Sequence, residues 1–349
     1  MVARTGEIFG SRQERRGSRT DLFVVSHVKM VPSSKWIDGA VSDQPVGGVA
    51  REVLQARLET VWHWLPLAAE RSEADVEYVH RLRVSTRRAV EAVRVFRKML
   101  RPSHRREVKE RLRQIRRTAN DARDLDVLAE RLAHSTAGNG LRGVTAFLER
   151  ISLWRKEAQR PIVAVYRELL EERSDYLTNQ LLEEIRFSGK RLRKREPTFG
   201  EKAPKFLKRV SKKFNEAARG DFSNIEALHA FRLAGKRLRY TMEILAGAFD
   251  PAFRSDLYPK VEQLQDYLGK VNDHATAQTR FQEWLGVIKV PEERACVESL
   301  LATEKAALVE SRDALLGWWT PERRDLLGTS LKAYCFKPGG SKRAVYLQM

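Results

Sequence analysis

The stretch HRLRVSTRR begins at His80 and the stretch HAFRLAGKR begins at His229, so one pattern occurs twice at an offset of 149 residues. The offset holds without a gap for more than forty residues. It aligns these pairs: Arg83 with Arg232, Arg87 with Lys236, Arg88 with Arg237, Pro102 with Pro251, Gln114 with Gln263 and Asp124 with Asp273. A register of this length indicates two copies of one unit, so any surface that the pattern forms is formed twice.

Both stretches predict an amphipathic helix, because their residues separate into two faces at about 100° per residue. In the first helix the polar face carries His80, Arg83, Arg87 and Arg94. The opposite face carries Leu82, Ala89, Val93, Phe96 and Leu100, and the second copy has Phe231, Leu238, Met242, Leu245 and Phe249 at the same positions. We therefore expect each helix to bury its apolar face and to turn its basic face outward. Two such faces brought together would form a strongly positive cleft.

The positive charge of the chain is concentrated in two segments. The net charge is +19 over 349 residues, and residues 75–117 hold 15 Lys/Arg against 5 Asp/Glu. Residues 186–213 hold 12 Lys/Arg against 2 Asp/Glu. Concentrated charge of one sign weakens a fold by self-repulsion unless an anionic partner neutralises it. A polyanion, an anionic membrane surface or an acidic protein could each neutralise this charge.

The remaining sequence predicts an all-α protein, because Leu, Ala, Arg, Glu and Lys dominate and strand-like alternation is scarce. We expect two pseudo-symmetric four-helix bundles, formed by the internal repeat, around a central basic cavity. The expected helices cover about 48–71, 75–100, 102–133 with an interruption near 120–124, a segment ending near 175, and then 204–219, 223–249, 251–286 and 291–318. The corresponding divisions are a flexible N-terminal arm (1–46), a helical domain (47–318) and a basic, loose C-terminal tail (319–349). Within the domain, repeat one covers about 47–175, a basic connector about 176–203 and repeat two about 204–318.

The sequence lacks the signals that are typical of several classes of protein. The start of the chain has no continuous apolar run, and no stretch is long and apolar enough to cross a membrane. Cys296 and Cys335 form no metal or redox spacing and are too few for a disulfide framework. We therefore expect a cytoplasmic protein that binds no membrane and needs no cofactor.

The basic face has an alternative interpretation, because charged helix faces are usually only solvated. Two features favour binding instead. The first stripe has no Glu at helical spacing for ion pairing. Arginine also outnumbers lysine on it, and the planar guanidinium suits bidentate contact with phosphate. The two histidines could instead be satisfied core residues; as metal ligands they lack a second His, Cys or carboxylate three or four residues away.

The paired His-x-x-Arg-x-x-x-Arg/Lys-Arg helices resemble those of the CHAD family, the conserved histidine α-helical domain. Supporting stretches are ARDLDVL at 122–128, RLRYTMEIL at 237–245 and LQDYLGKVNDHATA at 264–277, and the likeness covers about 48–318. The resemblance implies two four-helix bundles around a positive cavity that binds inorganic polyphosphate. The candidates that it implies are His80, Arg83, Arg87, Arg88, His229, Arg232, Lys236, Arg237 and Arg239. Asn120 departs from the pattern, since it replaces a glycine that the second copy keeps as Gly269. We expect no catalytic triphosphate-tunnel domain beside the helices, although some family members have one.

Further residues complete the predicted site. Arg94 belongs to the first basic stripe, Tyr240 adds to the second, and Arg113 and Arg116 follow Pro102 on a helix that can extend the basic surface. Glu243 stands where the first copy has Arg94, and we expect it to pair with a neighbouring arginine. The aspartates Asp124, Asp126 and Asp273 could bind a metal, but helix capping or pairing with the arginines of the cavity is the favoured interpretation.

The function predicted from these residues is non-enzymatic capture of inorganic polyphosphate, with an association with polyphosphate granules following from it. The alternative is non-specific binding of RNA or DNA at low salt, which positive charge alone permits. The first stripe has no interleaved aromatic residue on which bases could stack. A phosphate-processing enzyme is disfavoured because GGSK at 339–342 lacks the spacing of a P-loop. A scaffold for acidic protein partners remains a further alternative.

Overall fold

A computed structural model describes residues 34–135, 144–171, 178–183, 185 and 196–336. Contacts divide the chain into Met1–Val31 and Pro32–Met349, and the description that follows concerns the second unit. Every named element in the described ranges is a helix. The predicted all-α class is therefore confirmed. Within these ranges no helix has the length and apolar character that a membrane span requires.

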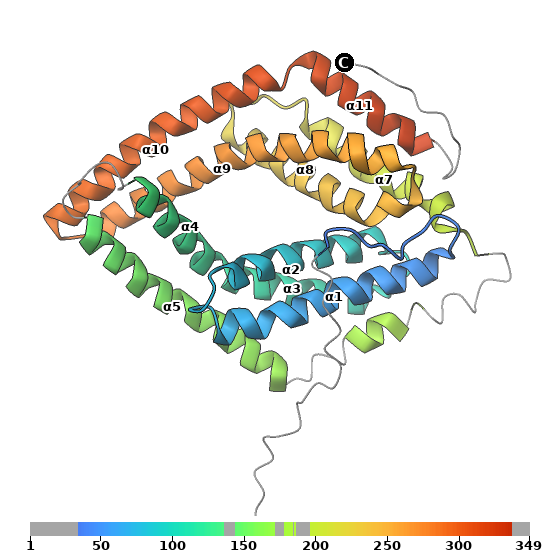
Figure 1. Cartoon of the computed structure of the whole chain (residues 1–349), viewed down its shortest axis with the longest axis horizontal. Coiled ribbons are helices and arrows are strands. Elements are labelled where there is room, and N and C mark those ends of the chain that lie inside the picture. Colours follow the sequence, from blue (N-terminus) through green and yellow to red (C-terminus); the bar gives the residue numbers. More distant parts are fainter. Residues whose placement is uncertain (1–33, 136–143, 172–177, 184, 186–195, 337–349) are drawn as a thin grey trace, which may run out of the picture. The chain divides into compact units, whose positions relative to one another are not determined.

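In the described residues of the first copy, the chain forms five helices (Figure 1). They are α1 (Val46–Glu70), α2 (Glu77–Val95), α3 (Pro102–Thr118), α4 (Asn120–Ser135) and α5 (Val144–Glu171). Pro102 begins α3, where a residue without a backbone N–H is tolerated. The expected interruption near 120–124 falls at Ala119, between α3 and α4.

The second copy has a similar order of elements. They are α7 (Phe199–Ala217), α8 (Ile225–Leu245), a short 3₁₀ turn (Ala246–Ala248), a π-helical turn (Phe253–Leu257), α9 (Tyr258–Val287) and α10 (Pro291–Trp318). Helix α9 runs unbroken through Gly269, whereas the first copy breaks just before Asn120. The helices of the two copies therefore differ at the same position at which Asn120 replaces the glycine of the family pattern.

Side chains at the starts of α7 and α8 explain why these helices begin where they do. Thr198 accepts a hydrogen bond from the Glu201 backbone N–H, and the Glu201 carboxylate accepts one from the Thr198 N–H. This reciprocal arrangement satisfies two N–H groups that have no partner inside the helix. The Asn224 side chain accepts from the Glu226 N–H in the same way.

Equivalent positions of the two copies are buried in the same way. The apolar stripe of α2 and its C-terminal end is buried at Leu82, Ala89, Val93 and Phe96, and that of α8 at Phe231, Leu238, Met242 and Leu245. The 149-residue offset extends back to α1 and α7, where Leu54 and Ala203, and Leu58 and Leu207, are buried pairs. Both cationic helices are therefore held by the same pattern of packing.

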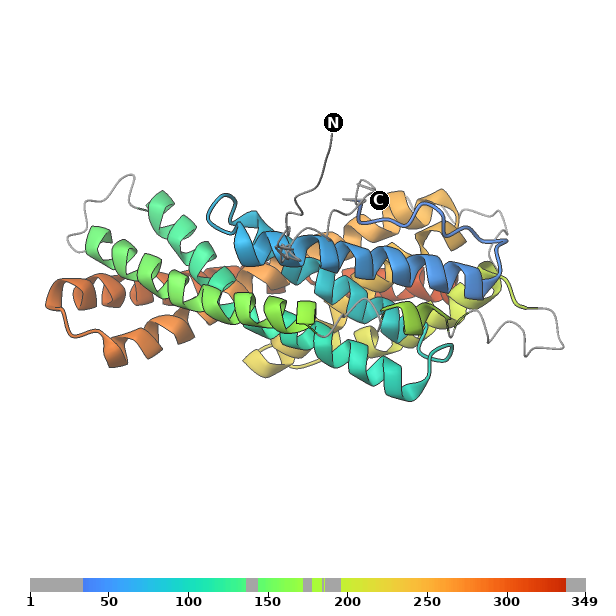
Figure 2. The same cartoon turned by 90° about the horizontal axis from the view of Figure 1, so that it is seen from below.

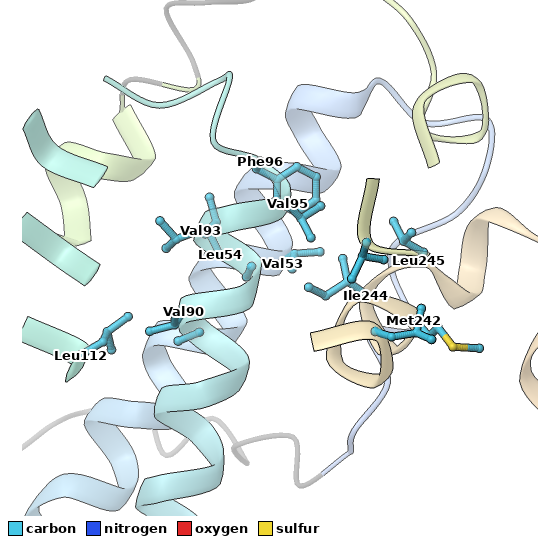
Figure 3. Packing of buried hydrophobic residues seen from close by; sticks show 14 of the residues in the cluster. Val53, Leu54, Val90, Val93, Val95, Phe96, Leu112, Met242, Ile244 and Leu245 are labelled. Atoms are coloured by element: carbon cyan, nitrogen blue, oxygen red, sulfur yellow. The ribbon is translucent and has the colours of Figure 1, made fainter. Parts of the chain in front are cut away.

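The hydrophobic core is shared between the copies. One large cluster contains buried residues of α1, α2, α7 and α8 together. Figure 3 shows part of it, with Val53 and Leu54 near Val93 on one side and Ile244 and Leu245 on the other. A second cluster joins α4 and α5 to α9 and α10 through Phe147, Phe281 and Trp284, and Figures 1 and 2 show these four helices at one end. The division into two pseudo-symmetric bundles stays a prediction, because each cluster draws on both copies.

The expected loose C-terminal tail is wrong for residues 321–336, which form α11 (Pro321–Phe336). Leu327, Leu331 and Cys335 recur every four residues, are buried, and face α7. This apolar spacing outweighs the basic character of the segment on which the prediction rested. Residues 337–349 lie outside the described residues.

The expected flexible arm is also wrong in its last part, residues 34–45. Ala40 is fully buried, and the Trp36 ring lies 4.7 Å from the Tyr258 ring. The Lys35 ammonium pairs with Glu262 at 3.0 Å, and Arg57 donates to the Lys35 carbonyl at 2.6 Å. These contacts tie the segment to α1 and α9. Residues 1–33 lie outside the described residues, as do residues 176–177, 184 and 186–195 of the predicted connector.

Candidate anion-binding site

A cavity of about 740 Å³ lies between the two repeated helices. Helix α2 contributes Arg83, Arg87 and Arg94, and α3 adds Arg116. Helix α8 contributes His229, Arg232, Lys236, Arg237 and Tyr240. The predicted basic stripes therefore face one shared space, and nine of the thirteen predicted site residues line it.

Helices α4 and α9 form the remaining walls and supply carboxylates. Arg83 pairs with Asp124 at 3.0 Å and donates to the Asn120 carbonyl at 3.0 Å. At the equivalent positions Arg232 pairs with Asp273 at 4.0 Å. The prediction that these two aspartates hold arginines of the cavity is confirmed. Each pair orients a guanidinium while leaving other N–H groups to a ligand.

The arginines of the cavity are incompletely satisfied. The Nε–H groups of Arg83 and Arg232 are buried without a hydrogen-bond partner among the described residues. Burial lowers the pKa values of Arg83, Arg116 and Arg232, and neighbouring arginines lower them further. A guanidinium stays charged despite such shifts, because its intrinsic pKa lies far above neutral pH. The cavity therefore retains charge that a bound anion would neutralise.

Lys236 responds differently to the same surroundings. Burial, followed by the charges of Arg232 and Arg87, lowers the pKa of its ammonium to about 6, although Asp273 opposes the shift. Without a bound anion, Lys236 is thus largely neutral at pH 7.5. An anion placed beside it would favour the charged form and raise its pKa.

Two buried glutamates connect the repeated helices across their interface. Arg88 of α2 donates to Glu243 of α8 at 2.7 Å, and the Glu243 side chain is fully buried. A second pair has its arginine on α8 and its glutamate on α2. Arg237, the equivalent of Arg88, lies 3.7 Å from Glu91 of α2. Glu91 also accepts a hydrogen bond from Arg94 at 3.0 Å, so the expectation that the first basic stripe has no Glu at helical spacing for ion pairing is wrong. The prediction that Glu243 pairs with an arginine is confirmed, and the two pairs join α2 to α8.

Four predicted residues lie outside the cavity lining. His80 and Arg88 line a separate hollow of about 380 Å³ on another side of α2. Burial lowers the pKa of His80, as do Arg123, Arg87 and Arg83, so this imidazole is neutral near pH 7. Arg239 lies 3.6 Å from Glu262 and over the Tyr240 ring, and Arg113 pairs with Glu110 at 3.1 Å.

The third aspartate of the predicted set has another role. Asp126 is buried and accepts a hydrogen bond from Arg155 of α5 at 2.6 Å, so it joins two helices away from the cavity. Across the described ranges no cluster of three or more His, Cys, Asp or Glu side chains could hold a metal ion.

The cavity also contains cations that the sequence analysis missed. Arg131 of α4 and Arg280 of α9 line it at positions 149 residues apart. Arg131 pairs with Glu304 at 3.5 Å and Arg280 with Asp121 at 2.7 Å, so both pairs join the two copies. The repeat could have identified them, because Arg131 lies seven residues after Asp124 and Arg280 lies seven residues after Asp273.

These features define a class of all-α protein in which two copies of one cationic helix face a single cavity. The CHAD domain family matches residues 52–282, and the chain belongs to this family. The predicted resemblance is therefore confirmed. No curated protein matched the sequence.

Two solved structures share the fold. The crystal structure of the CHAD domain from the plant Ricinus communis has a TM-score of 0.58 and 22% identity, covering 84% of this chain and 93% of that one. PptA from Streptomyces chartreusis has a TM-score of 0.57 and 16% identity, covering 79% of this chain and 99% of that one.

The link between α2 and α8 generates a prediction about stability. Glu243→Gln keeps the side-chain shape but removes the buried charge that Arg88 and Arg57 face. Breaking a buried pair on one side leaves an uncompensated charge, so the free energy of unfolding should fall by about 3–5 kcal/mol. Denaturant titration at pH 7 measures this loss.

The matched control is Glu283→Gln, whose carboxylate is 58% exposed and lies 3.5 Å from Arg280. An exposed pair contributes only about 0–1 kcal/mol. Equal losses for the two variants would show that Glu243 does not hold the helices together.

Proposed function

We propose that the protein binds inorganic polyphosphate in the cavity between α2 and α8. The observation that carries the proposal is that equivalent cations of the two copies face one space, as Arg83 and Arg232 do. A linear polyanion placed there would accept charge-assisted hydrogen bonds from both helices at once. Its binding would also release the counterions that neutralise polymer and protein separately.

The chemistry of the cavity lining favours polyphosphate over nucleic acid. Tyr240 is the aromatic residue among those that line the cavity in the described part of the chain, and it is only 4% exposed. Single-stranded nucleic acids gain much of their affinity from bases that stack on open aromatic faces. Polyphosphate needs cations alone, which the cavity supplies from five helices.

The proposal describes binding without hydrolysis. The carboxylates Asp124 and Asp273 are engaged with arginines, which suits them to position cations rather than to activate water. We place this binding in the cytoplasm, where a protein of this kind can associate with polyphosphate granules.

The first test removes one equivalent arginine from each stripe. Arg83→Ala with Arg232→Ala should weaken polyphosphate binding at least about tenfold at physiological salt, and should reduce the log–log salt slope by about 1.4, or 0.7 per lost contact. Circular dichroism should show that the helices remain formed. Titration at several salt concentrations, with single-stranded RNA as competitor, measures both quantities.

The control removes two exposed arginines outside the cavity, Arg160 and Arg219, and should bind polyphosphate like the parent. A cavity variant that binds like this control would refute the site. RNA that displaces polyphosphate at physiological salt would favour a nucleic-acid function instead.

The second test uses the low pKa of Lys236. Bound phosphate should raise this pKa from about 6, so the complex holds more protons than the free protein above that pH. Affinity for long polyphosphate should therefore fall as pH rises from 6 towards 9. Titration across this range measures the dependence.

Lys236→Arg is the matched variant, since the equivalent position in the first copy is Arg87. Its guanidinium stays charged throughout, so it should bind more tightly than the parent at pH 8 and with a smaller pH dependence. Because both proteins keep every histidine, the difference between their profiles reports on Lys236. Identical profiles would mean that Lys236 does not contact the anion.

A further inference from the structure

Lys236 is the single lysine among the residues that line the cavity, within the described part of the chain. It lies four residues after Arg232 on α8, so the two side chains are neighbours on one face of that helix. Arg87 of α2 lines the same space from the facing helix. The Lys236 amine is therefore held among guanidinium groups from both copies of the repeat.

The protein provides this amine with no anionic partner. Within the described ranges Lys236 forms no ion pair, because Asp273, the carboxylate that acts on it, pairs with Arg232 at 4.0 Å. Burial and the charges of Arg232, Arg87 and Arg239 hold the pKa of the amine near 6, so its nitrogen has a free electron pair at pH 7.5. A desolvated lysine beside other cations is an activated nucleophile.

The repeat shows that the amine belongs to one copy only. The equivalent position in the first copy is Arg87, whose guanidinium stays protonated and cannot act as a nucleophile. Arg83 and Arg232 occur at equivalent positions of both copies, and their Nε–H groups are buried without a partner among the described residues. The cavity thus combines one nucleophilic nitrogen with cations that can hold an anion beside it.

We propose that Lys236 is an acylation site whose acyl donor is a small acyl phosphate, the mixed anhydride of a carboxylic acid and phosphoric acid. The phosphate group of the donor accepts charge-assisted hydrogen bonds from Arg83 and Arg232. Because Arg232 is the helical neighbour of Lys236, this binding brings the donor carbonyl within reach of Nζ. Holding two reactants together in this way accelerates their reaction.

The transfer step is a substitution at the carbonyl carbon. The electron pair of Nζ forms a bond to this carbon, and the bond from the carbon to the bridging oxygen breaks. Inorganic phosphate leaves with that oxygen and its electron pair, and the guanidinium groups stabilise the charge that develops on it. The nitrogen loses one proton to water. The amide that remains is uncharged, so acylation removes one cation from the cavity.

The test treats the protein with acetyl phosphate, well below saturation, and maps acetyl-lysine by peptide mass spectrometry. At pH 7.4 an ordinary lysine is neutral in only about one molecule in a thousand, so Lys236 should react at least about tenfold faster than the exposed Lys289 and Lys305. Its rate should level off above about pH 7, because below saturation the pH dependence reports the pKa of the free protein.

A neutral acetylating reagent separates guidance by the cavity from the reactivity of the amine alone. The preference for Lys236 over Lys305 should be at least about tenfold larger with acetyl phosphate than with N-hydroxysuccinimidyl acetate, because only acetyl phosphate presents an anionic group to the arginines. The matched variant is Lys236→Arg, which keeps a cation at this position. It should lose this one acetylation, while Lys289 and Lys305 react as in the parent.

The outcomes separate this inference from the proposed function, since the inference uses the capacity of the cavity to hold an anion but does not require polyphosphate. An equal preference for Lys236 with both reagents would overturn it, and so would acetylation of Lys236 no faster than that of Lys305. Either result leaves the polyphosphate titration of the Arg83→Ala and Arg232→Ala protein to decide the proposed function. Guided acetylation in a protein that fails to bind polyphosphate would support the inference and refute the proposed function.

Discussion

The structure depends on holding like charges close to one another around the cavity. Two stripes of arginine and lysine face each other, and their mutual repulsion opposes the folded state. Carboxylates placed behind and between the stripes offset this repulsion. Asp124 and Asp273 each hold one arginine of the cavity, and Glu91 and Glu243 join α2 to α8. Because these carboxylates compensate only part of the charge, the space keeps the capacity to take up an anion.

The apolar packing fixes the geometry in which this electrostatic balance operates. The stripes lie on the faces opposite the buried residues of α2 and α8, so the core orients the cations as a group. At the far end Phe147, Phe281 and Trp284 join α4 and α5 to α9 and α10, next to the walls of the cavity. The ion pairs Arg131–Glu304 and Arg280–Asp121 join the same region. The cavity is thus framed by contacts between the copies rather than by either copy alone.

Sequence reasoning predicted what depends on periodicity within one helix. The repeat offset and the spacing of apolar residues identified α2 and α8, their buried faces and their basic stripes. The charge at Glu243 also predicted its pairing with an arginine. Such patterns give the angular position of a side chain on its helix, but they do not say which neighbouring element stands opposite. Arg88 and Arg239 are therefore on basic helices yet pair with carboxylates, the buried Glu243 and the half-buried Glu262.

Other features depended on packing that composition conceals. Residues 34–45 and 321–336 were expected to be loose because they are polar or basic, yet Ala40 and Leu331 are fully buried in the core. A second basic hollow, of about 280 Å³, lies between the end of α2, the start of α3, and helices α7 and α8, so no single stretch of sequence could predict it.

The most direct measurement is a crystal structure of the protein grown with polyphosphate. Our account predicts a continuous chain of phosphate density between the α2 and α8 stripes, within hydrogen-bond distance of guanidinium groups from both. Phosphates found only on the outer surface, with the space between the stripes filled by water, would contradict it.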